Sequence, residues 1–283
     1  METWLITGAS RGLGAHITRQ ALAAGHRVMA AARNPDNVGT RFPDADPQRL
    51  IPVALDVTDA ASATAAAALA QELFGGVDVL VNNAGQGMLG AVEEVSDREA
   101  RLVYDTNVFG VMNVLRAVLP GMRARRGGRV VNISSVGGFE ASTGWGVYCS
   151  TKFALEGLSE ALSLELAPLG VKVVIIEPGY VRTDFLDSSS LRRAAQALDD
   201  YAVSAGAMRA TATSVNHSQP GDPAKVAQAI VMIAGHPDPP LRLQLGPDCV
   251  ERVEEKLRTV RAELDQWRTT AMSTGHDEDA LAN

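Results

Sequence analysis

Short apolar runs rich in Val, Ile and Leu alternate along this 283-residue chain with longer alanine-rich or amphipathic segments. This alternation is typical of βαβ units, whose parallel strands are covered by helices on both faces. Seven runs have the length and composition of such strands: 3–7, 27–32, 50–55, 77–82, 128–133, 172–177 and 241–245. We therefore expect an α/β fold built on a doubly wound parallel sheet of about seven strands.

Helices are expected between these strands, at 12–24, 58–74, 97–125, 147–169, 223–234 and 249–270. Ser96 and Glu99 lie three residues apart before an apolar-periodic run, which predicts a capping box at the start of the third helix. No linker-like boundary divides the chain. We therefore expect one domain over residues 1–270, ending in a C-terminal helix, and a polar tail over 271–283.

The segment 185–222 interrupts the alternation of strands and helices with serines, small residues and a Pro-Gly-Asp-Pro sequence. It follows a late strand, at the edge of a doubly wound sheet where ligands bind. We interpret it as a substrate lid, and the alternative is a mobile surface loop.

Composition and charge exclude several classes of function. The net charge of −7 gives no general attraction to nucleic acid or anionic membranes, and no apolar run is long enough to cross a bilayer. Two cysteines without metal-like spacing and five scattered histidines predict neither a disulfide framework nor a metal site. We expect a cytoplasmic protein that binds neither nucleic acid nor membranes.

A glycine-rich stretch, TGASRGLG at 7–14, joins the first strand to the first helix. Glycines at such a junction let the backbone approach a pyrophosphate, whose charge is held by amides at the helix N-terminus. The spacing differs from G-x-G-x-x-G, which indicates a different dinucleotide-binding family. The candidate cofactor-binding residues in this loop are Gly8, Ser10, Arg11, Gly12, Leu13 and Gly14.

The end of the second strand lacks the carboxylate that would bind the ribose 2′-hydroxyl of NAD. Small residues are followed instead by Arg33, and Arg11 lies in the glycine loop. Guanidinium groups match a 2′-phosphate, which favours NADP(H) over NAD(H). The alternative is that both are ordinary surface arginines.

Residues that end the third and fourth strands complete the predicted cofactor site. Asp56 and Val57 follow the third strand, where they could meet the adenine, although Asp56 could instead stabilise the next helix. Asn83, Ala84 and Gly85 allow close approach to a ribose, or form a plain turn.

Tyr148 and Lys152 lie four residues apart near the start of a predicted helix, so that they share one face. A phenol has an ordinary pKa of about 10 and needs a nearby cation to exchange protons near neutrality. Lys152 is placed to be that cation. Cys149 points away from this face and is expected to pack in the core.

Six elements of the sequence together resemble the short-chain dehydrogenase/reductase family: TGASRGLG, NNAG at 82–85, Asn107, Ser134-Ser135, YCSTK at 148–152 and Pro178-Gly179. They occur in the family's order over about residues 3–183. The resemblance implies a single Rossmann-like domain with a seven-stranded parallel sheet, assembled as a homodimer or homotetramer.

The resemblance also implies roles for particular residues. Tyr148 becomes the general acid in reduction and the base in oxidation, Lys152 lowers its pKa and holds the nicotinamide ribose, and both contact the cofactor. Ser135 hydrogen-bonds the substrate carbonyl, with Ser134 the weaker candidate by spacing, and Asn107 supports a water chain unless it only packs a helix. The segment that contacts the nicotinamide is matched by Pro178, Gly179, Val181 and Thr183.

We therefore predict an NADPH-dependent carbonyl reductase of the hydroxysteroid-dehydrogenase-like branch, acting on a fairly bulky apolar ketone, aldehyde or secondary alcohol. A 3-oxoacyl-carrier reductase and a non-catalytic NADP(H)-binding sensor are the alternatives. Several residues could line an apolar substrate pocket or equally pack in the core: Gly137, Phe139, Trp145, Tyr180, Phe185 and Leu186.

Overall fold

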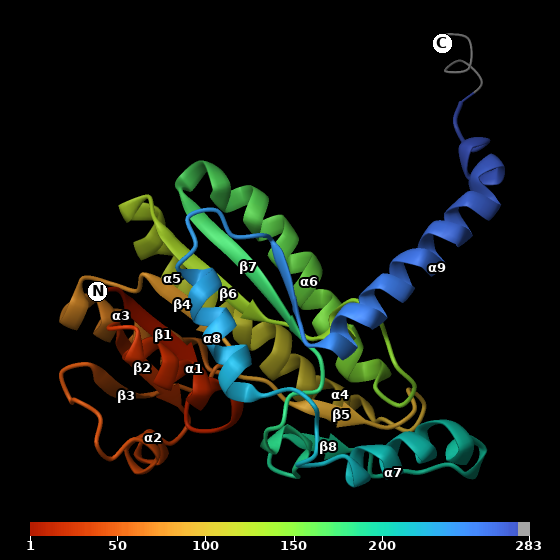
Figure 1. The fold of residues 1–283 in the computed structure, drawn as a ribbon, viewed down its shortest axis with the longest axis horizontal. Helices are drawn as coiled ribbons and strands as arrows, with labels where there is room; N and C mark the ends of the chain where they lie inside the picture. The colour runs from red at the N-terminus through yellow and green to blue at the C-terminus, as the bar shows by residue number, and fades with distance from the viewer. Residues whose placement is uncertain (277–283) are drawn as a thin grey trace.

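A seven-stranded sheet, parallel throughout, forms the centre of the molecule in the computed structural model, which describes residues 1–276 (Figure 1). Its order is β3-β2-β1-β4-β6-β7-β9. The strands are β1 (Thr3–Thr7), β2 (Arg27–Ala32), β3 (Leu50–Ala54), β4 (Val79–Asn82), β6 (Gly128–Ile133), β7 (Val171–Pro178) and β9 (Arg242–Leu245). The strand order reverses between β1 and β4, and at such a point the carboxyl ends of the strands leave a crevice for a ligand. The predicted Rossmann-like fold is confirmed.

Helices cover both faces of the sheet. On one face lie α1 (Gly12–Ala23), the short α2 (Asp36–Arg41), which was not predicted, and α8 (Pro223–Ala234). On the other lie α3 (Ala60–Phe74), α5 (Gly110–Arg125) and α6 (Gly146–Leu166). Each layer has its own apolar core, because strands such as β1 are buried along their whole length.

The helix predicted over 97–125 contains a π-helical turn. The capping box of Ser96 and Glu99 starts α4 (Asp97–Tyr104) as expected. The backbone then widens at Asp105–Phe109 before it continues as α5. Such π-turns often mark functional positions, and this one carries Asn107.

The segment 185–222 has regular structure of its own and lies beside the carboxyl edge of the sheet (Figure 1). Its strand β8 (Leu191–Arg193) pairs in parallel with β5 (Gly87–Leu89), and its main helix is α7 (Ala207–Ser214). Arg209 on α7 pairs with the buried Glu94 at 2.6 Å. That hydrogen bond, with backbone amides of Leu198 and Ala91, lowers the pKa of Glu94 to about 2. The segment is therefore attached to the body by a charged contact.

The C-terminal helix α9 (Pro247–Met272) starts against β7 and then projects from the body (Figure 1). At its base, the carboxylate of Asp248 accepts a hydrogen bond from the Tyr180 amide at 2.8 Å, and Cys249 donates its thiol hydrogen to the Glu177 carbonyl. The helix runs two residues past its predicted end, into the predicted tail. Residues 277–283 of that tail lie outside the described residues. Across residues 1–276, we find no helix both long and apolar enough to span a membrane.

Candidate active site

A cavity of about 470 Å³ opens at the carboxyl edge of the sheet, within the size range of small-molecule sites. It extends from Arg33 after β2 to Tyr148 on α6. Most of the predicted site residues line it: Gly8, Ser10, Arg11, Gly12, Leu13, Arg33, Asp56, Val57, Asn83, Ala84, Gly85, Ser135, Gly137, Trp145, Tyr148, Lys152, Pro178, Gly179, Tyr180, Val181, Thr183, Phe185 and Leu186. The fold thus brings the predicted cofactor and chemical residues into one space.

Three predicted residues do not line this cavity. Gly14 lies inside the turn, where an added Cβ would overlap the Gly8 carbonyl oxygen, and its contact with a cofactor stays a prediction. Phe139 packs against the buried Val136 and Val253, which fits the core-packing alternative rather than the pocket. Asn107 is buried behind the cavity wall.

The glycine loop has the conformation that an anion site requires. Gly8 and Gly12 have φ angles of +66° and +51°, in the left-handed region that favours glycine. A Cβ at Gly8 would lie 3.1 Å from the Cα of Ala84, so the β1 and β4 ends approach closely. The N-terminal amides of α1 follow directly, and a helix N-terminus favours a phosphate.

The two predicted phosphate-binding arginines differ in their surroundings. Arg33 is exposed at the end of β2 and lines the cavity. Arg11 instead donates to the carbonyl of Ser189 at 2.7 Å and to the Ser190 hydroxyl at 2.9 Å, and lies 3.6 Å from an Asp184 oxygen. The glycine loop is therefore linked to the segment that follows β7, a contact that the sequence did not predict.

Asp56 and Asn83 both line the cavity while making structural contacts. The Asp56 carboxylate accepts hydrogen bonds from the amide and hydroxyl of Thr58, as expected if it stabilises the chain before α3. The Asn83 side chain donates to the Thr7 carbonyl at 2.9 Å. These contacts fix the loops that follow β3 and β4.

Tyr148 lies between two aromatic rings. Its ring centroid is 5.6 Å from that of Trp145 and 5.8 Å from that of Phe185, which comes from the segment after β7. Burial raises the pKa of the phenol, and a hydrogen bond with Ser135 opposes that shift. The phenol is therefore protonated across the physiological pH range.

Lys152 lies one helical turn further along α6. Its Nζ donates to the Ile133 carbonyl at 2.8 Å and is 5.9 Å from the centroid of the Tyr148 ring. Burial lowers the pKa of Lys152 to about 8, and the carboxylate of Glu156 opposes this shift. Ser135 is the contact that lowers the pKa of Tyr148 in this structure, and the expectation that Lys152 lowers it stays a prediction.

Asn107 connects the two sides of the site from behind. Its amide donates to the Gln86 carbonyl at 2.9 Å and to the Thr151 hydroxyl at 3.0 Å, and its oxygen accepts from the Gln86 amide. Thr151 is the neighbour of Lys152 in α6. The π-turn therefore positions Asn107 as a bridge between the end of β4 and helix α6.

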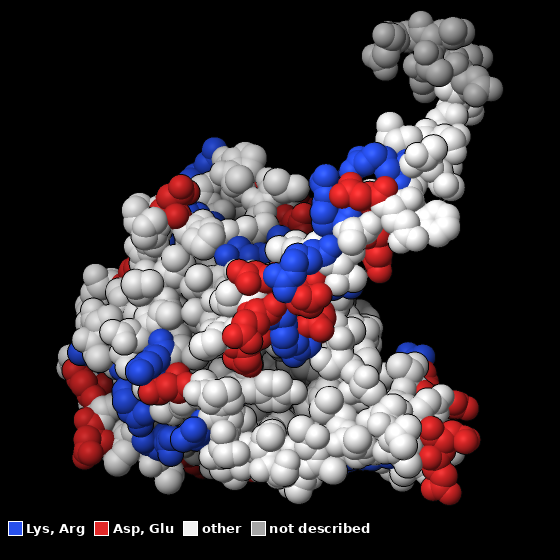
Figure 2. Space-filling model, turned by 45° about the vertical axis from the view of Figure 1, so that its right-hand side comes forward, with Lys and Arg blue, Asp and Glu red and all other residues white. Residues whose placement is uncertain are grey.

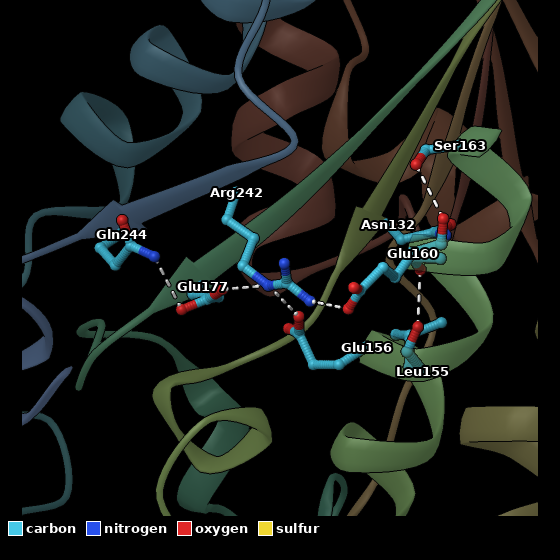
Figure 3. Close-up of polar contacts among 9 residues, drawn as sticks. Asn132, Leu155, Glu156, Glu160, Ser163, Glu177, Arg242 and Gln244 are labelled. Atoms are coloured by element: carbon cyan, nitrogen blue, oxygen red, sulfur yellow. Dashed lines mark hydrogen bonds and ion pairs between the residues drawn. The ribbon is translucent and has the colours of Figure 1, made fainter. Parts of the chain in front are cut away.

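A charged cluster that the sequence did not predict extends from Lys152 toward the last strand. Figure 3 shows Arg242 of β9 reaching Glu156 and Glu160 of α6 at 3.0 and 2.8 Å, and Glu177 of β7 at 3.6 Å. Glu156 and Glu177 are buried, and burial raises the pKa of each carboxyl. The positive charge of Arg242 thus offsets the negative charges of carboxylates on both α6 and β7.

Two further cavity residues, Arg192 and Arg252, were not predicted from the sequence. Arg192 on β8 donates to the Gln86 side chain at 2.7 Å, and Arg252 on α9 donates to the Ser142 hydroxyl at 2.7 Å. They come from the segment after β7 and from the last helix, where no motif marks a site.

The doubly wound sheet, the glycine loop and the buried Tyr148–Lys152 pair together form the site of a Rossmann-like oxidoreductase. The family model for short chain dehydrogenase matches residues 2–194 of the sequence. The chain therefore belongs to this family. It therefore acts on CH–OH or C=O groups of small molecules.

Similar proteins include both named and structurally solved members. "Oxidoreductase BOA17" from Botryotinia fuckeliana is 35% identical, covering 96% of this chain and 99% of the relative. A 3-ketodihydrosphingosine reductase from Bacteroides thetaiotaomicron is 38% identical, covering 86% and 87%. A short-chain dehydrogenase structure from Streptomyces avermitilis is 41% identical, with a TM-score of 0.88 over 97% of this chain and all of that one.

Related structures hold nicotinamide cofactors of both kinds. A serine dehydrogenase complexed with NADP+ is 28% identical, with a TM-score of 0.73 over 87% of this chain and 95% of that chain. A family member from Burkholderia phymatum in complex with NAD is 25% identical, with a TM-score of 0.79 over 93% and 95%. A nicotinamide cofactor is therefore supported for this chain.

Proposed function

We propose that this protein is an NADPH-dependent carbonyl reductase that reduces a fairly bulky, apolar ketone or aldehyde and can run in reverse on the secondary alcohol. The observation that carries the proposal is the buried phenol of Tyr148, whose raised pKa keeps it protonated, in the cavity that Ser135 and Lys152 also line. A phenol with a raised pKa is a proton donor at neutral pH, which is the form that reduction requires.

The residues present fit a dinucleotide along the carboxyl edge of the sheet. The glycine loop and the α1 N-terminus would hold its pyrophosphate, and Pro178 to Thr183 would contact its nicotinamide end. Bound there, the cofactor supplies the hydride that arrives at the carbonyl carbon. Arg33, with no carboxylate at the end of β2, supports a 2′-phosphate and hence NADPH.

The protein's own groups then handle the oxygen. Tyr148 transfers its proton to the carbonyl oxygen as the hydride reaches the carbon, which yields the alcohol. Ser135 contributes a second hydrogen bond to that oxygen and stabilises the developing negative charge. Lys152 and Asn107 stabilise the part of the site around Tyr148. They also form the route along which a new proton reaches the phenol after each turnover.

The substrate class is inferred from the walls of the cavity near Tyr148. Trp145, Phe185 and Leu186 form an apolar surface there, supplied partly by the segment 185–222. We propose that this segment acts as the substrate lid. The relative named 3-ketodihydrosphingosine reductase supports a ketone as the reacting group.

The alternative of a 3-oxoacyl-carrier reductase needs a basic docking surface beside the cavity mouth. The obvious basic cluster, Arg123 to Arg129, lies where α5 ends and β6 begins, at the amino edge of the sheet and opposite the cavity. Arg125 in this cluster donates to the carbonyls of Gly75 and Val77 and is used structurally. Assembly as a homodimer or homotetramer in the cytoplasm stays a prediction.

NADPH consumption with a panel of cyclic and aryl ketones tests the proposal. We expect turnover by the wild type and a loss of at least a hundredfold in Tyr148→Phe, with NADPH binding retained. Tyr104→Phe is the matched control, because Tyr104 makes only an exposed hydrogen bond to Ser150. Cofactor binding without turnover on any carbonyl would favour the non-catalytic sensor.

A further inference from the structure

The projecting part of α9 carries an apolar stripe. Its members are spaced alternately three and four residues apart: Val250, Val253, Leu257, Val260, Leu264 and Trp267. This is the spacing of the a and d positions of a coiled coil. Val253 packs against the body, but the exposed fractions from Leu257 to Trp267 lie between 46% and 61%. The stripe thus continues from the core into solvent without a partner in residues 1–276.

Charged side chains flank this stripe at the positions that select a coiled-coil partner. Glu254 and Arg261 occupy successive e positions, and Lys256 and Glu263 occupy successive g positions. Figure 2 shows acidic and basic side chains intermixed along the projecting helix. None of the ion pairs found in residues 1–276 involves Lys256 or Glu263, so both are free to meet a partner, whereas Arg261 also pairs with Asp265 of its own helix at 2.9 Å.

When two α9 helices pair antiparallel, one register places opposite charges against each other at all of these positions. When Leu257 faces Val260 of a second copy, Glu254 faces Arg261 and Lys256 faces Glu263. The two-fold symmetry makes each of these attractive pairs occur twice. The same register places Trp267 against Val250, which is 43% exposed, whereas Val253 is already buried against the body and lies at the end of the paired stretch.

Other arrangements of the same two helices bring like charges together. In a parallel pair, Lys256 faces Arg261 of the second copy, and this repulsion offsets the attraction between Glu263 and Arg268. In an antiparallel pair shifted by one heptad, Arg261 faces itself and Glu263 faces itself. Charge complementarity therefore selects one arrangement out of the three.

We propose that α9 is a self-association arm through which two copies of this chain pair antiparallel along the stripe from Val250 to Trp267. The contact is separate from the cavity and does not depend on the proposed activity. Because only about three heptads take part, we expect a weak and reversible association.

Trp267 reports on this contact. The other two tryptophans, Trp4 and Trp145, are buried in the body, whereas Trp267 is 61% exposed. Acrylamide quenching of the full-length protein should therefore fall severalfold as the concentration rises. Sedimentation velocity on the same samples should show the association.

A charge-swap cycle tests the register. We expect Lys256→Glu and Glu263→Lys each to raise the concentration at half-association about tenfold, and the double variant to restore it. Arg258→Glu is the matched control, because Arg258 pairs with Glu255 of its own helix on the face away from the stripe. It should leave the midpoint unchanged.

Four results would overturn the proposal. Tighter association of Lys256→Glu would indicate a parallel pair, and equal behaviour of all variants would show that the stripe does not pair. Protection of Trp267 only on adding phosphatidylglycerol vesicles would assign the stripe to a membrane surface. Oligomers formed through the body alone would leave the quenching independent of concentration, which also contradicts the arm.

Discussion

Glu156 lies one helical turn beyond Lys152 on α6 and pairs with Arg242 of the last strand at 3.0 Å. The carboxylate opposes the effect of burial on the lysine, and the arginine compensates the carboxylate in turn. The charge state of the proposed catalytic lysine therefore depends on β9, which is far from it in the sequence.

Glu156→Gln should lower the pKa of Lys152 further below about 8, because the variant loses the group that favours the charged ammonium. We expect the alkaline limb of the pH profile of kcat/KM for ketone reduction to move down by about one unit. Glu160→Gln is the control, since Glu160 contacts the same arginine but is exposed. An unmoved or upward-shifted limb in Glu156→Gln would refute this coupling.

Lys152→Met should stabilise the fold while it abolishes turnover. The pKa of Lys152 is lower in the folded state than its ordinary value, so the folded chain binds fewer protons between about pH 8 and 10.5. The wild type therefore carries a penalty that is full below pH 8 and fades as the pH rises toward 10.5. Urea unfolding at pH 7 should show a gain of roughly 1–3 kcal/mol in the variant, shrinking by pH 10. A loss of stability at pH 7 would mean that the bond to Ile133 outweighs burial.

Arg33→Ala tests the cofactor preference. Because Arg33 is exposed at the end of β2, its removal should leave the fold unchanged and weaken NADPH binding by at least tenfold. NADH binding should change less than twofold, since NADH has no 2′-phosphate. Fluorescence titration of both cofactors measures this, and equal losses would remove the argument for NADPH.

Arg209→Met should loosen the segment 185–222 from the body. The variant leaves the Glu94 carboxylate without its guanidinium partner, so the segment loses its charged attachment. We expect faster limited proteolysis within 185–222 and a severalfold higher KM for a bulky ketone, with a smaller change in kcat. Arg101→Met, which breaks an exposed pair with Asp97, serves as the control and should change neither.

The sequence predicted the sheet and most of the site because both depend on local patterns. Apolar runs place the strands, and the carboxyl ends of parallel strands meet at one edge, so Gly8, Ser135 and Tyr148 had to converge. The π-turn at Asn107 has no comparable local signal.

Contacts between distant segments could not be read in the same way. Arg242 meets Glu156 across 86 positions, and Arg252 reaches Ser142 across 110. The sequence left Phe139 open between the pocket and the core, and its packing against Val253 of α9 places it in the core. Only the packed fold decides which side of a loop residue faces the cavity.

The contact of Arg11 with Ser189 and Ser190 also has a consequence for how cofactor binding and opening of the 184–190 segment are coupled. The guanidinium of Arg11 has a limited number of N–H donors. A 2′-phosphate and the 184–190 segment would therefore compete for the same hydrogen bonds. By reciprocity, if the nucleotide weakens the hold on that segment, then opening of the segment must favour the nucleotide by an equal factor. The affinity for the cofactor and the access of substrate to Tyr148 would then both report the same equilibrium, which is the opening and closing of the 184–190 segment.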